Sequence, residues 1–173
     1  NSVFPRDPHN LPALEGPRND PALLRAALSH DATGLFPEDN LRLVTERDMA
    51  EVLGEVEDFL SSARRDDMVL LYYSGHGTLD QTGEFYLCAR DTRVDRLRST
   101  AVKASDVSEM IAQSAARSTI VLLDCCHSGR FKAATAAAQD RLAGRGRFVI
   151  TSSRGTELAN DTDAVNRASL FTH

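Results

Sequence analysis

The stretch TIVLLDCCHSGRF, residues 119–131, decides the fold class. It opens with a run of β-branched residues and leucines, which is typical of a strand covered on both faces of a sheet. The run ends in an acid, two adjacent cysteines, a histidine, a serine and a glycine. We therefore expect a buried parallel strand with reactive side chains at its carboxyl end, where open α/β sheets bind their ligands.

Similar apolar runs occur on both sides of this stretch. They are MVLLYY at 68–73, which ends in SGHG, and RFVITSS at 147–153. Shorter strands are predicted at LRLVT (41–45) and EFYLCA (84–89), and amphipathic helices at 20–28, 49–60 and 105–115. The Asp20-Pro21 pair resembles a helix start, and 130–145 is interpreted as a charged, alanine-rich connection. Strands alternating with helices predict one α/β domain, with a mostly parallel sheet and helices on both faces.

Composition limits the class of protein. The 173 residues suffice for one domain with a sizeable core, and a net charge of −5 argues against nucleic-acid binding. No apolar run approaches the roughly 20 residues of a membrane span, and no signal-peptide pattern opens the chain. Three cysteines are too few for a disulfide framework, so a reducing, cytoplasmic setting is expected.

Two of the predicted strands end in residues able to form a nucleophile–base pair. Ser74-Gly75-His76-Gly77 follows one strand, and Asp124 to Gly129 follows the other. An imidazole beside a thiol promotes formation of the thiolate, which is the attacking species. Taken singly, each residue has an ordinary explanation: a free cysteine is commonly a small buried residue, and a histidine beside glycine is commonly a turn residue. Their combination favours catalysis.

The two motifs resemble those of a known enzyme family. YYSGHG (72–77) and LLDCCHSG (122–129) look like the paired motifs of caspase-like cysteine peptidases, and are closer to metacaspases and prokaryotic caspase homologues than to animal caspases. Cys126 follows His76 by 50 residues, the separation known for caspases. The resemblance extends to LPALEGPRNDPALLRAAL (11–28) and SLFTH (169–173), and it implies a three-layer α/β/α caspase-like fold.

The resemblance assigns the catalytic roles. His76 matches the catalytic histidine, and Cys126, directly before H-S-G, matches the nucleophile. The backbone amides of Gly77 and Cys126 would form the oxyanion hole. The family requires no third acid, so the imidazole would be oriented by a backbone carbonyl or by nothing that the sequence shows. Cys125 is then a small buried neighbour, and Cys88 a packing residue.

Substrate specificity would come from two acids. Asp124 and Asp20 match the aspartates that line the S1 pocket of metacaspase-like enzymes and accept a basic P1 side chain. The resemblance therefore implies cleavage after basic residues, Arg first and Lys second, and not after Asp. The competing explanation for Asp20 is a plain helix N-cap.

Processing and metal binding are the next expectations. Family members are often cut after the nucleophile, and the basic residues there, all interpreted as exposed, are Arg130, Lys132, Arg141 and Arg145. No cofactor or metal is expected. Some metacaspases respond to calcium, but the loop acids Asp80, Asp91 and Asp95 lack EF-hand spacing. Adjacent Cys125 and Cys126 are poor zinc ligands compared with a C-x-x-C pair.

The family's sheet normally begins with an apolar strand before the first loop and continues beyond SLFTH. We therefore expect residues 1–173 to be an incomplete domain and a segment of a larger protein. That protein would carry a fused or associated regulatory or sensor module, with a protein or peptide as substrate, and neither nucleic acid nor membrane as partner. The alternatives are a catalytically silent interaction module, and a cysteine hydrolase or transferase acting on a non-peptide substrate.

Overall fold

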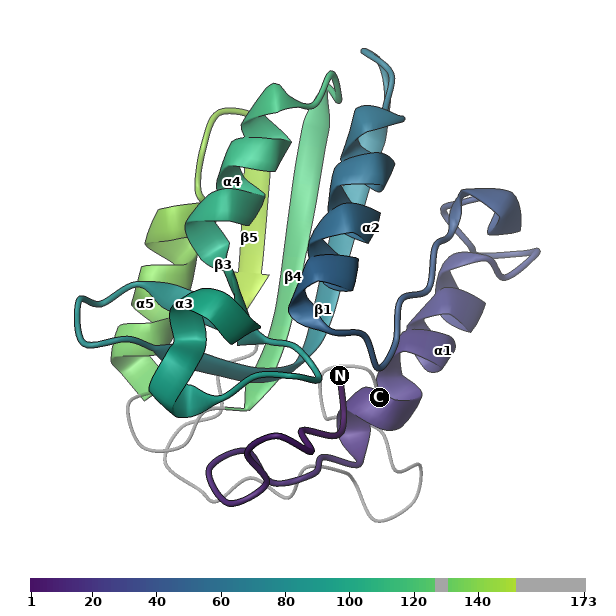
Figure 1. Cartoon of the computed structure of the whole chain (residues 1–173). Coiled ribbons are helices and arrows are strands. Elements are labelled where there is room, and N and C mark those ends of the chain that lie inside the picture. The colour runs from purple at the N-terminus through teal and green to yellow at the C-terminus, as the bar shows by residue number, and fades with distance from the viewer. Residues whose placement is uncertain (127–130, 152–173) are drawn as a thin grey trace.

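The structure is a computed structural model and describes residues 1–126 and 131–151. Its centre is an open sheet with the strand order β3-β2-β1-β4-β5. The strands are β1 (Met68–Leu79), β2 (Phe85–Cys88), β3 (Ala101–Lys103), β4 (Ser118–Cys126) and β5 (Arg147–Thr151). Strands β1, β4 and β5 run parallel, and β2 and β3 extend the sheet in antiparallel pairing (Figure 1). The predicted α/β fold with a mostly parallel sheet is confirmed.

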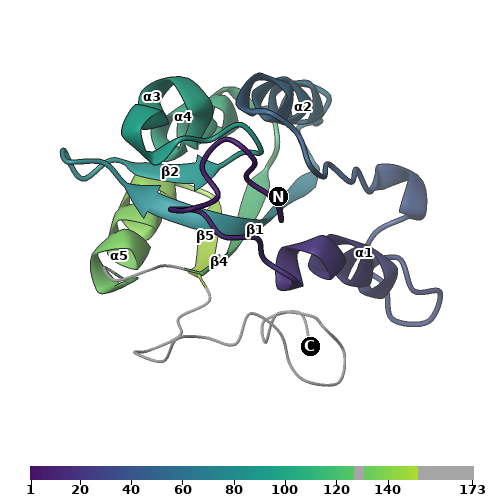
Figure 2. The ribbon, with the colours of Figure 1, turned by 60° about the horizontal axis from the view of Figure 1, so that its bottom comes forward.

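Helices lie on both faces of this sheet. They are α1 (Gly16–Leu28), α2 (Met49–Ser61), α3 (Leu97–Thr100), α4 (Ala104–Gln113) and α5 (Phe131–Leu142), with short 3-10 turns η1 (Glu38–Asn40) and η2 (Val94–Arg96). Figure 2 shows α1 and α2 on opposite sides of β1. Helix α4 packs against both α2 and α5.

Alternate residues of the strands form the main hydrophobic core. Val69 of β1 and Val121 and Leu123 of β4 point toward α2, α4 and α5. They meet side chains of those three helices: Leu60, Val107, Ile111, Ala138 and Leu142. Because side chains of a strand alternate between its faces, the even-numbered residues of β1 and β4 point to the other side, where α1 lies. The candidate site is built on that side.

Most of the predicted elements are confirmed. The strand runs at 68–73, 84–89 and 119–124 correspond to β1, β2 and β4, and 147–151 forms β5. The helices predicted at 49–60 and 105–115 correspond to α2 and α4. At the start of α2, Glu51 Oε2 accepts a hydrogen bond of 3.0 Å from the Asp48 amide, as its capping sequence predicts. The SLFTH motif lies outside the described residues.

The strand predicted at 41–45 is wrong. Residues 41–44 form one wall of an apolar groove, and the other wall includes residues 70–74 of β1. Strand β1 pairs with β2 only at residues 77–79, so this part of its edge faces the groove rather than another strand. The groove separates the two segments, and without hydrogen-bond pairing an extended segment is not part of a sheet.

The connection predicted at 130–145 is also wrong in part, because residues 131–142 form helix α5. Alanines dominate this helix, and alanine has the highest intrinsic helix propensity. Among its described side chains, Ala138 and Leu142 are buried in the main core and Ala137 packs against it. The hydrophobic stripe is therefore short, which explains why periodicity failed to indicate a helix.

Candidate active site

The candidate active site lies where β1 and β4 run side by side to their carboxyl ends. The parallel register pairs Ser74 with Asp124, Gly75 with Cys125 and His76 with Cys126. The register therefore brings together His76 and Cys126, which are 50 residues apart in the sequence. The structure describes Cys126 by its backbone alone, so its place in the site is a position on the strand.

The two cysteines occupy neighbouring positions at the end of β4, and the structure describes the side chain of Cys125. Cys125 packs against the main hydrophobic core. It also lies close to Gly77, where an added Cβ would be 3.4 Å from Cys125 Cβ and 2.6 Å from Phe85 Cζ. Glycine is required at position 77 because a side chain there would collide with the Phe85 ring. Cys125 thus contributes to packing on the core side of the sheet, although it is half-buried rather than buried as the sequence predicts.

The imidazole of His76 is held by residues from the first loop of the chain. Its Nε2 lies 2.8 Å from the backbone carbonyl oxygen of Pro12, and its ring centroid lies 4.9 Å from that of Phe4. A carbonyl oxygen can only accept, so Nε2 carries the proton in this hydrogen bond. In the neutral ring, Nδ1 is then the nitrogen able to accept a proton. Of the two options that the sequence leaves open, the structure shows a backbone carbonyl orienting this histidine.

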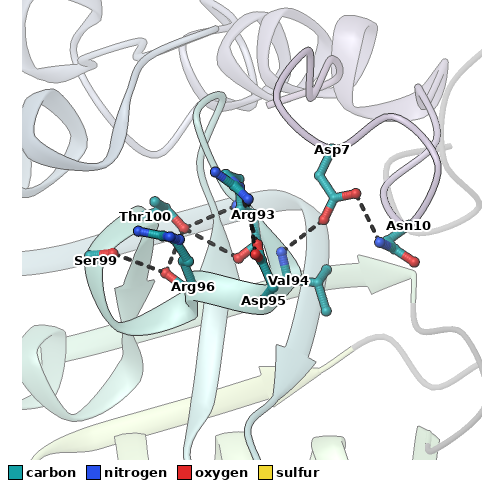
Figure 3. Close-up of polar contacts among 8 residues, drawn as sticks. All are labelled: Asp7, Asn10, Arg93, Val94, Asp95, Arg96, Ser99 and Thr100. Carbon is teal, nitrogen blue, oxygen red and sulfur yellow. Dashed lines mark hydrogen bonds and ion pairs between the residues drawn. The ribbon is translucent and has the colours of Figure 1, made fainter.

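The loop that carries Phe4 and Pro12 is itself fixed by two carboxylates. Glu46 accepts hydrogen bonds from the Ser2 amide and hydroxyl at 2.8 and 2.6 Å. Asp7 accepts one from the Val94 amide at 2.9 Å and one from Asn10, which ties the loop to the segment around η2 (Figure 3). The hydrogen bond from Val94 holds the pKa of Asp7 below its ordinary value. Both carboxylates therefore stabilise the loop in their ionised form.

Asp20 and Asp124 approach each other through Ser74. Asp20 is 0% exposed, and its Oδ2 accepts a hydrogen bond of 2.8 Å from the Ser74 hydroxyl. Asp124, 5% exposed, is the register partner of Ser74 on the neighbouring strand. Ser74 and Asp124 thus lie two residues before His76 and Cys126 on their strands, and Asp20 reaches Ser74 from helix α1. Two acids buried in one place form a site suited to a cation.

The interpretation of Asp20 as a helix N-cap is wrong. Helix α1 begins at Gly16, with Glu15 as its N-cap and Pro17 in its first turn. Asp20 and Pro21 lie inside the helix, where Pro21 has no amide to donate to the carbonyl four residues earlier. The carboxylate of Asp20 points to Ser74 rather than to the amides at the helix start. The ordinary explanation for this acid is thereby removed.

A family model for the caspase domain matches residues 1–172, which is nearly the whole chain. The chain belongs to the caspase family. Members of this family are cysteine endopeptidases. No curated protein matches the chain. None of the helices in the described ranges is long and apolar enough to cross a membrane.

The third cysteine of the chain, Cys88, is buried and has a thiol of low reactivity. Burial raises the pKa of the Cys88 thiol to about 12. Its side chain is 0% exposed and packs against Phe4 and Leu11. Such a thiol stays protonated near neutral pH and is inert as a nucleophile. Cys88 has the packing role that the sequence predicts.

The three loop acids considered for calcium each have a protein partner. Asp80 accepts a hydrogen bond of 2.8 Å from the Thr82 amide, and Asp91 accepts one of 2.8 Å from the Met49 amide. Asp95 forms an ion pair of 2.9 Å with Arg93 (Figure 3). Within residues 1–126 and 131–151, no group of three potential ligands lies close enough to hold a metal ion. The described residues do not fit a calcium site.

The candidate self-cleavage residues fall in different surroundings. Arg130 lies outside the described residues, and Lys132 and Arg141 lie in helix α5. Arg141 lies 3.6 Å from Glu84 in an ion pair. Arg145 lies in an exposed turn between α5 and β5. The prediction that all four occupy exposed connections is therefore wrong for Lys132 and Arg141.

Sequence reasoning missed three contributors to the site. The SGHG motif gives Ser74 no role of its own, yet the Ser74 hydroxyl donates a hydrogen bond to Asp20. Phe4 and Pro12 lie in a loop without periodicity, and they reach His76 across more than 60 residues of sequence. Ser74 lies two residues before His76 on the same strand, so its side chain is expected on the same face, and this spacing could have indicated it. Nothing in the sequence pattern indicates Phe4 or Pro12.

Proposed function

We propose that this caspase domain is an endopeptidase that cleaves after basic residues through a Cys126–His76 dyad. The observation that carries the proposal is the register of β1 and β4, which pairs His76 with Cys126 at adjacent strand tips. It is supported by the Pro12 carbonyl, which lies 2.8 Å from Nε2 and fixes the orientation of the imidazole. A dyad needs a base in a fixed orientation beside its nucleophile.

The reaction follows from these assignments. The Cys126 thiol transfers its proton to His76, and the thiolate adds to the substrate carbonyl carbon. A C–S bond forms while the carbonyl π pair moves to oxygen, where the Gly77 and Cys126 amides stabilise the charge. The intermediate collapses, the C–N bond breaks, and the leaving amine takes the proton from His76. Water then hydrolyses the thioester, with His76 as the general base.

The preference for a basic P1 residue rests on the two buried acids. Asp124 occupies the same side of the sheet as His76, and Asp20 binds Ser74, the register partner of Asp124. A guanidinium can satisfy two carboxylates with several charge-assisted hydrogen bonds, and an acidic P1 side chain would be repelled by both. Arg is therefore the expected first choice, Lys the second, and Asp is excluded.

Hydrolysis of matched fluorogenic peptides tests this proposal. Substrates that differ only in Arg, Lys or Asp at P1 are compared by kcat/KM, using the full natural protein. We expect turnover of the Arg peptide, weaker turnover of the Lys peptide and none of the Asp peptide. Preference for Asp would contradict the acidic pocket. No turnover together with no labelling by a thiol-reactive peptidyl electrophile would favour a silent interaction module.

We further propose that the enzyme processes itself after Arg145. A peptidase binds its substrate as an extended segment, and Arg145 occupies an exposed turn between Gly144 and Gly146, whereas Lys132 and Arg141 are held in α5. Intact mass spectrometry of the wild type beside Cys126→Ala checks this. We expect a new fragment boundary after Arg145 in the wild type only. Intact masses that differ only by the Cys126→Ala substitution itself would contradict self-processing.

A further inference from the structure

Tyr73 lies directly behind the candidate site, on the core side of β1. Its hydroxyl is 2.7 Å from the backbone carbonyl oxygen of His76 and 2.9 Å from that of Cys88. The side chain packs partly buried against the main core. Because Tyr73 is odd-numbered and His76 is even-numbered, the phenol does not enter the substrate side of the sheet. It touches the backbone of the site from behind.

Gly75 makes this contact possible. A Cβ at position 75 would lie 2.6 Å from the Tyr73 hydroxyl oxygen and 2.9 Å from its Cζ. The backbone φ angle of Gly75 is also +156°, a value that residues other than glycine rarely adopt. The chain thus keeps position 75 empty, and the tyrosine extends over it to reach the carbonyl of His76.

The carbonyl that Tyr73 holds belongs to the same peptide unit as the Gly77 amide. This unit is planar, and no peptide bond among the described residues is cis. In a planar trans unit the N–H points opposite to the C=O. Fixing the His76 carbonyl on the Tyr73 side therefore fixes the Gly77 N–H on the opposite side. That N–H is one of the two proposed donors to the oxyanion.

We propose that Tyr73 is a positioning residue that sets the direction of the Gly77 oxyanion donor. The inference rests on the proposed function, because the donor matters only if a tetrahedral intermediate forms at Cys126. Oxyanion stabilisation depends on donors that already point to the developing charge, since reorienting a peptide unit during the reaction costs free energy. The tyrosine acts on the peptide from outside the substrate cleft, so it influences the transition state without contacting the substrate.

Tyr73→Phe removes the hydroxyl and keeps the ring. We expect kcat for the Arg peptide to fall about tenfold, less than the loss for deleting a donor outright, with KM nearly unchanged. Binding of a peptidyl arginine aldehyde, whose adduct carries a tetrahedral oxygen, should weaken by a similar factor. Alkylation of Cys126 by iodoacetamide forms no oxyanion, so its rate should stay at the wild-type value. Tyr72→Phe is the matched control, since it removes the same atom one residue earlier on the other face of β1.

Three results would overturn the proposal. The first is Tyr73→Phe hydrolysing the Arg peptide like the wild type. The second is an equal loss of hydrolysis and of iodoacetamide alkylation, which would place the effect on His76 or on the fold. The third is an equal loss in Tyr72→Phe. The proposed function is tested apart from these by wild-type turnover and its loss in Cys126→Ala, which do not depend on Tyr73.

Discussion

Cys126→Ala is expected to lower hydrolysis of an Arg peptide on the order of a thousandfold or more, to the background. The substitution removes the atom that would form the C–S bond, and no neighbouring group can replace it. Cys125 faces the core side of β4, and burial raises the pKa of Cys88 to about 12, so neither supplies a thiolate to the site. The kcat/KM for the Arg peptide and labelling by an arginyl chloromethyl ketone measure the loss.

Cys125→Ala is the matched control, because it removes a thiol from the adjacent position of the same strand. Its sulfur packs against the core, so we expect a destabilisation of about 1 kcal/mol and retention of most of the activity. The free energy of unfolding of both variants shows whether either substitution disturbs the fold. Equal loss of activity in the two variants would mean that the vicinal pair acts as a unit, and would contradict the assignment of the nucleophile.

The features that sequence predicts best are those fixed by local pattern. Continuous apolar runs specify β1 and β4, and parallel strands in one sheet place their carboxyl ends at one edge. This rule brings His76 and Cys126 together before any contact is known. The order of the motifs along the chain therefore suffices to predict the dyad and the side of the molecule on which it lies.

The features that sequence predicts poorly depend on distant or ambiguous contacts. Asp20-Pro21 looks like a helix start, but α1 begins earlier because Pro17 also suits a first turn. Residues 41–44 have strand composition, yet strand formation needs a partner at pairing distance, and the groove intervenes. The carbonyl of Pro12 carries no side-chain signal at all. Its contact with His76 depends on how an irregular loop is held by Glu46 and Asp7.

Gly75 is a residue whose type goes against the local preference of a strand. Gly75 occupies the interior of a strand, where glycine is unfavourable because it packs no side chain and loses much conformational freedom. Glycine is nevertheless needed at this position, because a Cβ there would collide with the Tyr73 hydroxyl. The strand thus gives up stability beside His76 and Gly77, two residues that the proposed function uses. Deviations from local preference are expected where function is located.

Asp124→Asn is expected to lower kcat/KM for an Arg peptide about 100-fold. This factor corresponds to the loss of one strong hydrogen bond to a charged group. Asparagine keeps the shape of the side chain and removes its charge. Asp124 is almost fully buried beside Ser74, so little water is available to screen its attraction for a guanidinium. Asp20→Asn should act in the same direction, since Asp20 is buried and binds Ser74, the register partner of Asp124.

A citrulline peptide separates the loss of charge recognition from a general loss of activity, because citrulline has the shape of arginine without its charge. The wild type should strongly prefer Arg to citrulline at P1. In Asp124→Asn and Asp20→Asn this preference should shrink, mainly through slower cleavage of the Arg peptide. Asp48→Asn, at an exposed helix start far from β4 in the sequence, is the control and should leave the preference intact. Equal losses for both peptides in Asp124→Asn would instead indicate that the buried acid maintains the strand tip, and the basic specificity would have to originate elsewhere.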